Sequence, residues 1–193
     1  MCHAAWGIFL GSTTMDLSLL LWLVLAVLLF WGVGLYNRLM RLRARSLEVL
    51  GVVEKHASAC VVLVKQYVAA PGGSDRHAPV GAPWVGLHAA ASRLEQWLEQ
   101  SRSMPLQPDA IQSLSAAWAA MHAAWLDASE GPTDLAGPVM PPDMQEAWSA
   151  ASLKVQSASG GYNQIVARYN EAIQQYPARW VAGLMGFHPA GPF

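Results

Sequence analysis

The sequence predicts an all-α protein in which one N-terminal transmembrane helix continues into an antiparallel, up-and-down bundle of about four helices. A charge-free apolar run lies near the start, apolar residues then recur at spacings of four and three, and no stretch alternates as a strand does. The 193 residues suit an anchor plus one modest domain. We expect an N-terminal tail (1–16), a transmembrane helix (17–36), a bundle (37–176) and an apolar C-terminal tail (177–193).

The apolar run extends from Leu17 to Leu35 and holds no charged residue and one serine. At about 1.5 Å per residue it matches a hydrocarbon core of about 30 Å. Its leucines, valines and phenylalanine together favour insertion by on the order of 4–8 kcal/mol, enough to outweigh the serine and two glycines. Trp31 and Tyr36 lie where interfacial aromatic residues are found.

A cleaved signal peptide is the rival interpretation of this run. It fits poorly, because no Lys or Arg precedes the run, the run is longer than a usual signal core, and no small-x-small cleavage pattern follows. Four arginines follow the run directly: Arg38, Arg41, Arg43 and Arg45. The positive-inside rule therefore predicts an N-terminus outside and a C-terminal body in the cytoplasm. Met15 directly precedes the run, so a start there, without residues 1–14, is an alternative.

Two long helices are predicted to form the frame of the bundle. From Leu35 to Ala70 the apolar spacing is unbroken by proline, so the membrane helix is expected to continue as one rod as far as Pro71. A second long stripe runs from Asp143 to Tyr176, before Pro177. The two stripes are predicted to face one another, burying the following residues: Val53, Cys60, Val155, Tyr162 and Tyr169. A local kink is expected at Gly160-Gly161.

Two shorter helices are predicted between the long ones. One covers 84–102 and carries Leu87, Ala91, Leu94 and Leu98 on one face. The next starts at Pro108, and its stripe is Ile111, Leu114, Trp118, Met121 and Trp125. The prolines at 105 and 108 favour a reversal between these helices, so the last long helix should return toward the membrane. The alternative is that these two helices form one continuous rod, in which case the last long helix runs outward and the C-terminal tail caps the far end near Ala70. Segments 71–83 and 130–142 are rich in glycine and proline and are expected to be loops.

Every asparagine of the chain follows a tyrosine: Tyr36-Asn37, Tyr162-Asn163 and Tyr169-Asn170. The last two pairs are one heptad apart. We interpret them structurally, with the tyrosine filling the helix seam and the asparagine bonding a neighbouring helix to fix the register. A polar ligand site built from these pairs is the alternative.

The residue types that carry chemistry are sparse. His56 and Cys60 share a helical face at a spacing that metal sites use, but His88 and His122 could join them only by fortunate packing. We therefore expect a core histidine and a core thiol, with no metal and no cofactor. No motif for a nucleophile, a phosphate loop or a zinc hydrolase occurs, so no catalytic residue is assigned. The net charge of −1 argues against nucleic acid as a partner.

Two blocks of the chain carry a distinctive pattern: the exit of the apolar run, 34–43, and the C-terminal block 162–193. The positions of the pattern are Tyr36, Asn37, Arg38, Tyr162, Asn163, Tyr169, Asn170, Pro177, Gly183, Gly186, Phe187, Pro189 and Phe193. In these positions and their spacing the chain resembles the LemA family of bacterial membrane proteins. The middle of the chain departs from the family pattern, at 54–59, at Gly160-Gly161 and at the prolines 105 and 108. The resemblance implies a single-pass membrane protein with an up-and-down helical bundle and no established catalytic activity.

From these observations we expect a membrane-anchored interaction or scaffold protein without catalytic activity in the inner membrane of a bacterial cell. Its partners would be the lipid bilayer and another membrane or membrane-associated protein. Two alternatives remain open: an envelope protein whose bundle lies outside, and an accessory subunit of a membrane enzyme or a hydrolase without a familiar motif. Segment 180–187 is too apolar for a solvated end, so it should pack on the bundle, lie on the membrane surface or bind a partner.

Overall fold

The computed structural model describes residues 9–69, 82–130 and 140–193, and every regular element in these ranges is a helix. The helices are α1 (Phe9–Ala69), α2 (Ala82–Ser103), α3 (Pro108–Ser129), α4 (Pro142–Gln174) and α5 (Ala178–Met185). The predicted all-α class is confirmed. The expected boundaries of the bundle helices differ from the observed ones by one or two residues, whereas α1 begins at Phe9, inside the segment expected to be an N-terminal tail (1–16). The expected loops fall largely on 70–81 and 131–139, outside the described residues.

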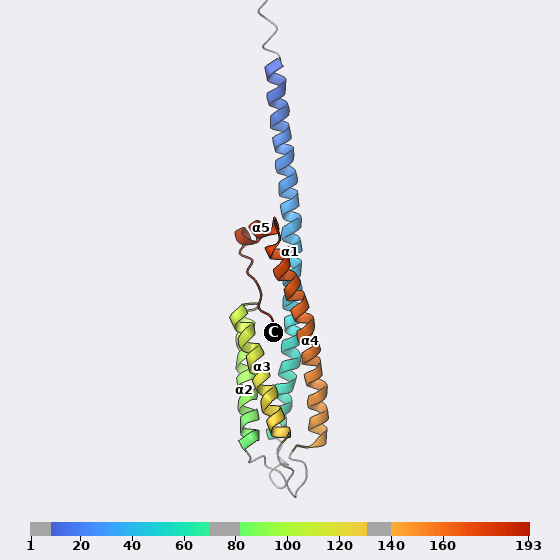
Figure 1. The fold of residues 1–193 in the computed structure, drawn as a ribbon, viewed down its shortest axis with the longest axis vertical. Coiled ribbons are helices and arrows are strands. Elements are labelled where there is room, and N and C mark those ends of the chain that lie inside the picture. The colour runs from blue at the N-terminus through green and yellow to red at the C-terminus, as the bar shows by residue number, and fades with distance from the viewer. Residues whose placement is uncertain (1–8, 70–81, 131–139) are drawn as a thin grey trace, which may run out of the picture.

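The apolar run and the first helix of the bundle are one continuous helix, α1, as predicted (Figure 1). Among the described residues, nothing packs on the part of α1 that carries the run, so its large apolar side chains, from Leu19 to Val33, are exposed. Burial begins at Leu39, where α1 enters the bundle. In the described chain, α1 is the one helix whose length and composition would let it cross a membrane.

The helices alternate in direction, and α4 returns toward the apolar run, as the prolines between α2 and α3 favoured (Figure 1). α1 and α4 pack along their shared length, while α2 and α3 form a hairpin held mainly by α1. The five residues predicted to lie between the long helices are all buried: Val53, Cys60, Val155, Tyr162 and Tyr169. Tyr176, expected at the end of the stripe, is exposed because α4 ends at Gln174.

Two groups of buried side chains make up the core. The far core lies away from the apolar run and joins α1, α2, α3 and α4. In it the Trp148 ring stacks on the Trp125 ring, with ring centroids 4.2 Å apart, and on the Trp118 ring, with ring centroids 6.1 Å apart. The near core lies next to the run and joins α1 and α4 to the C-terminal residues, including Phe187 and Ala190. Burying aromatic area on this scale dominates the packing energy of a small bundle.

A polar contact joins the ends of the two long helices, α1 and α4, that lie farthest from the run. The Tyr67 hydroxyl donates a hydrogen bond to Asp143 Oδ2 at 2.7 Å. This bond lowers the pKa of the Asp143 carboxyl and raises that of the Tyr67 hydroxyl. It joins the last turns of α1 to the first turn of α4, where an acidic side chain also suits the helix dipole.

α4 continues without interruption through Gly160 and Gly161, where we expected a kink. A Cβ atom at Gly160 would meet nothing within 4 Å. Gly160→Ala should therefore raise the free energy of unfolding by about 1 kcal/mol, because alanine loses less backbone entropy in a helix. Denaturant unfolding followed by circular dichroism would measure this. Gly186→Ala is the matched control: Gly186 has φ +69°, so alanine there should destabilise the chain. Destabilisation by Gly160→Ala would contradict the prediction.

Candidate functional site

Asn163 and Asn170, the asparagines of the last two Tyr-Asn pairs, bind the backbone of the segment 187–193. From here on we call this segment the tail; the tail expected from the sequence, 177–193, also includes α5. The Asn170 amide donates to the Ala190 carbonyl at 2.9 Å, and the Ala190 N–H donates to Asn170 Oδ1 at 2.9 Å. Asn163 makes the same double contact with Phe193, at 3.0 and 2.8 Å. Each side chain thus pairs with the N–H and C=O of one residue of the tail, much as a strand residue pairs with its neighbour.

The two tyrosines of these pairs hold the same segment from inside the near core. The Tyr162 hydroxyl donates to the Gly191 carbonyl at 2.9 Å, and the Tyr169 hydroxyl donates to the His188 carbonyl at 3.0 Å. Burial raises the pKa of both phenols, so both remain protonated donors. The two pairs together therefore fix the register of the tail on α4.

This arrangement corrects the expected role of the asparagines. We expected them to bond a neighbouring helix, whereas their partner is the tail. The reason is that the N–H and C=O groups inside a helix already bond one another. They are therefore not free to bond both the NH2 group and the oxygen of an asparagine side chain. An extended segment leaves both groups of each peptide unit available. The tyrosines do fill the interior of the α4 packing face, as expected.

The N-terminal Tyr-Asn pair has a different environment. The Tyr36 ring meets the Phe187 ring edge to face, with centroids 6.0 Å apart, at the point where the run enters the bundle. Asn37 and Arg38 are exposed on α1. This pair therefore contributes one aromatic contact to the tail and no amide pairing.

The remaining motif residues shape the path between α4 and the tail. Pro177 precedes α5, and Gly186 ends α5 with φ +69°, a left-handed cap that favours glycine. Phe187 is buried, Pro189 is exposed, and Phe193 is half-buried against both cores. Gly183 is exposed on α5, and a Cβ atom there would meet open space. The structure thus gives local reasons for Gly186, Phe187 and Phe193, and none for Gly183.

Gly191 is a tail residue that the motif did not include. A Cβ atom at this position would lie 2.7 Å from the Pro108 Cα, so any larger residue would collide with the first turn of α3. The tail therefore passes closely between α4 and the start of α3. The sequence signal was weak, since a glycine before Pro192 is equally typical of an unremarkable turn.

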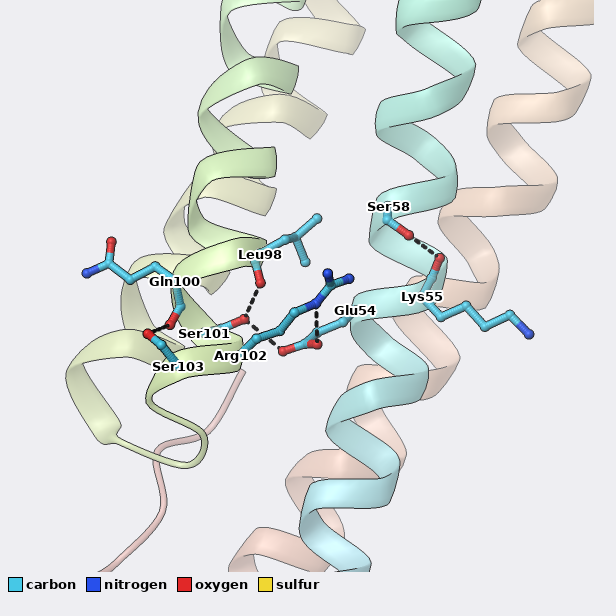
Figure 2. A network of polar contacts seen from close by, with 8 residues as sticks. All are labelled: Glu54, Lys55, Ser58, Leu98, Gln100, Ser101, Arg102 and Ser103. Atoms are coloured by element: carbon cyan, nitrogen blue, oxygen red, sulfur yellow. Dashed lines mark hydrogen bonds and ion pairs between the residues drawn. The ribbon is translucent and has the colours of Figure 1, made fainter.

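A buried carboxylate joins α1 to the end of α2 (Figure 2). Glu54 Oε1 accepts a hydrogen bond from the Ser101 hydroxyl at 2.7 Å, and Arg102 Nε lies 3.7 Å from Glu54 Oε2. Glu54 and Ser101 are both buried, so the carboxylate needs these partners. Nearer the other end of α2, Lys65 and Glu95 form a second ion pair between the same helices. These contacts set the position of α2 along α1.

The structure does not bring the candidate metal ligands His56, Cys60, His88 and His122 together into one metal-binding cluster. Cys60 is buried in the far core, and burial raises the pKa of its thiol to about 12. His56 is half-buried, His88 is exposed, and His122 lies beside the Trp148 ring. In the described ranges no three His, Cys, Asp or Glu side chains come close enough to hold a metal ion.

Two surface features lie at the end of the bundle next to the run. On and beside α5, large apolar side chains are exposed: Tyr176, Trp180, Leu184 and Met185. On the surface between α1 and α4 there is an open groove of about 1000 Å³ that carries arginines from both helices. We call it the basic groove. α5 lies beside α1 just beyond the run (Figure 1). The groove begins at Arg38, three residues after the end of the run.

Comparison with known protein families, with curated proteins and with solved structures finds no match to this chain.

Proposed function

We propose that the chain is a single-pass, membrane-anchored helical scaffold of LemA-like type, without catalytic activity, whose bundle lies in the cytoplasm next to a bacterial inner membrane. One observation carries the anchoring: α1 presents a bare apolar surface over the run and then enters the packed bundle without a break. A bare surface of this length needs lipid around it.

The same observation favours a retained anchor over a cleaved signal peptide. Residues just after the run are helical, and Leu39 is fully buried in the near core. The Phe187 ring covers the junction at Tyr36. A peptidase that needs an extended substrate would have to unfold this part of the bundle first.

α5 supports the same placement as a second membrane contact. Leu184 and Trp180 are 86% and 68% exposed, although both are strongly apolar. The helix that carries them, α5, lies beside the exit of the run (Figure 1). A short amphipathic helix with a tryptophan at this depth suits the interface between headgroups and acyl chains. The tail then holds α5 in place, because the Tyr-Asn pairs fix the residues that follow it.

The scaffold role is the part of the proposal that concerns partners. Among the described residues, no helix covers the faces of α2 and α3 that are turned away from α1 and α4, so these faces are available to another membrane or membrane-associated protein. Crosslinking in the membrane followed by mass spectrometry would identify such a partner. A captured substrate bound among convergent titratable groups would instead favour an enzyme or an accessory subunit of one.

Two cysteine reporters test the anchor and its side. Leu184→Cys lies on α5 and Leu153→Cys on α4, and both positions are exposed. Cys2 would be replaced by serine, whereas Cys60 can remain because its buried thiol, with a pKa of about 12, forms almost no reactive thiolate. In intact cells neither reporter should react with an impermeant thiol reagent. After permeabilisation position 153 should react readily and position 184 slowly.

Each outcome of this experiment bears on a separate part of the proposal. Labelling of position 153 in intact cells would place the bundle outside and favour the envelope alternative. Equal labelling of both positions after permeabilisation would show that α5 does not contact lipid. Release of the full chain from membranes by alkaline carbonate would overturn the anchor itself.

A further inference from the structure

We propose that the basic groove between α1 and α4 binds the phosphate of an anionic phospholipid headgroup. The inference rests on the proposed membrane anchor, because the anchor brings the groove to the headgroup layer. It goes further by assigning a ligand class to a specific set of side chains.

The groove collects positive charge from two distant parts of the chain. Arg38, Arg41 and Arg45 line it from α1, and Arg168 lines it from α4. The spacing of the α1 arginines places them on one helical face. Arg43 belongs to the same basic run but lies on another face, outside the groove. A general role in membrane orientation would depend equally on all four arginines that follow the apolar run. The groove instead contains three of them together with Arg168.

The charges in the groove are available to a ligand. Among the described residues, none of these four arginines has a hydrogen-bond or ion-pair partner. Glu48 and Glu171 also line the groove, so four cations face two carboxylates and leave an excess of positive charge. Guanidinium groups bind phosphate oxygens in a bidentate fashion. The carboxylates can accept hydrogen bonds from headgroup hydroxyls.

If the run spans the hydrocarbon core, the groove lies at the level of the headgroup phosphates. Arg38 lies two residues after Tyr36, and Arg38 and Arg45 are separated by roughly 10 Å along α1. That distance extends from the edge of the hydrocarbon core across the headgroup layer. Leu42, Val49 and Ala172 line the groove between the charged groups and give it an apolar floor. A lipid whose chains lie along the run could therefore place its phosphate among the arginines.

The test uses the full chain in nanodiscs of equal amounts of phosphatidylcholine and phosphatidylglycerol, with native mass spectrometry to identify the lipid that stays bound on release. The wild-type chain should retain phosphatidylglycerol in preference. R41Q/R168Q should reduce that preference by roughly tenfold or more, because two phosphate contacts are lost. The matched control is R43Q/R179Q, which removes the same charge near the run but outside the groove and should keep the preference.

The remaining outcomes separate the groove from the anchor. If the wild-type chain enters the discs but shows no lipid preference, or if both double variants lose it equally, the groove assignment is wrong and the anchor stands. If the chain does not enter the discs, the anchor fails as well. In discs of phosphatidylcholine alone, retention of inorganic phosphate that R41Q/R168Q abolishes would show a site for a free anion and overturn the headgroup assignment.

Discussion

Trp148→Ala should lower the free energy of unfolding by about 3–5 kcal/mol, the usual cost of removing a large aromatic side chain from a packed core. Trp148 is 3% exposed and stacks between Trp125 and Trp118 in the far core. Its removal would leave a cavity at the point where α3 meets α4. In a chain of this size, the loss corresponds to a fall in melting temperature of roughly 10 °C.

Thermal unfolding of the detergent-solubilised chain, followed by circular dichroism, would measure this loss. Trp180→Ala is the control, because the Trp180 side chain is exposed on α5 and its truncation should change stability by less than about 0.5 kcal/mol in detergent. Equal effects of the two variants would mean that the tryptophan stack does not hold α3 against α4.

Replacing both Asn163 and Asn170 with alanine should release the tail while the bundle stays folded. The double variant removes the paired contacts to Ala190 and Phe193, at a cost of about 3 kcal/mol. Hydrogen exchange at the amides of Ala190 and Phe193 reports the change directly, because these two N–H groups donate to the asparagines. Their exchange should become roughly a hundredfold faster.

Asn37→Ala provides a matched control for the double variant. Asn37 follows a tyrosine in the same way but is exposed and makes no amide pairing within the described structure. Its replacement should leave exchange in the tail unchanged. Rapid exchange at Ala190 and Phe193 in the wild-type chain would show that the tail does not dock at all.

The periodic parts of the fold could be predicted from the sequence. All four residues of the predicted α2 stripe are buried: Leu87, Ala91, Leu94 and Leu98. The five residues predicted to lie between α1 and α4 are buried as well. Such predictions succeed because the residues on the buried face of a helix recur with the helical period, and this recurrence can be read directly from the sequence. The return of α4 was also predictable, because the prolines at 105 and 108 favoured a reversal.

The tail contacts and the basic groove could not be predicted in the same way. Asn163 and Asn170 bind backbone groups, which every residue possesses, so no residue pattern marks their partner. Arg168 lies far along the chain from the basic run, and only the packing of α4 on α1 brings it beside Arg41 and Arg45.

Because α1 is one continuous helix, a change in the tilt of the proposed anchor would tilt the part of α1 in the bundle by the same angle. From Arg38 to Ala69 the helix extends roughly 48 Å beyond the run, with no hinge between the two parts. Spanning helices change tilt when the thickness of the surrounding bilayer changes. A tilt of about 10° would move the far end of α1 sideways by roughly 8 Å, and would carry the α2–α3 hairpin with it. A partner bound to that hairpin would therefore sense the thickness of the membrane without touching it.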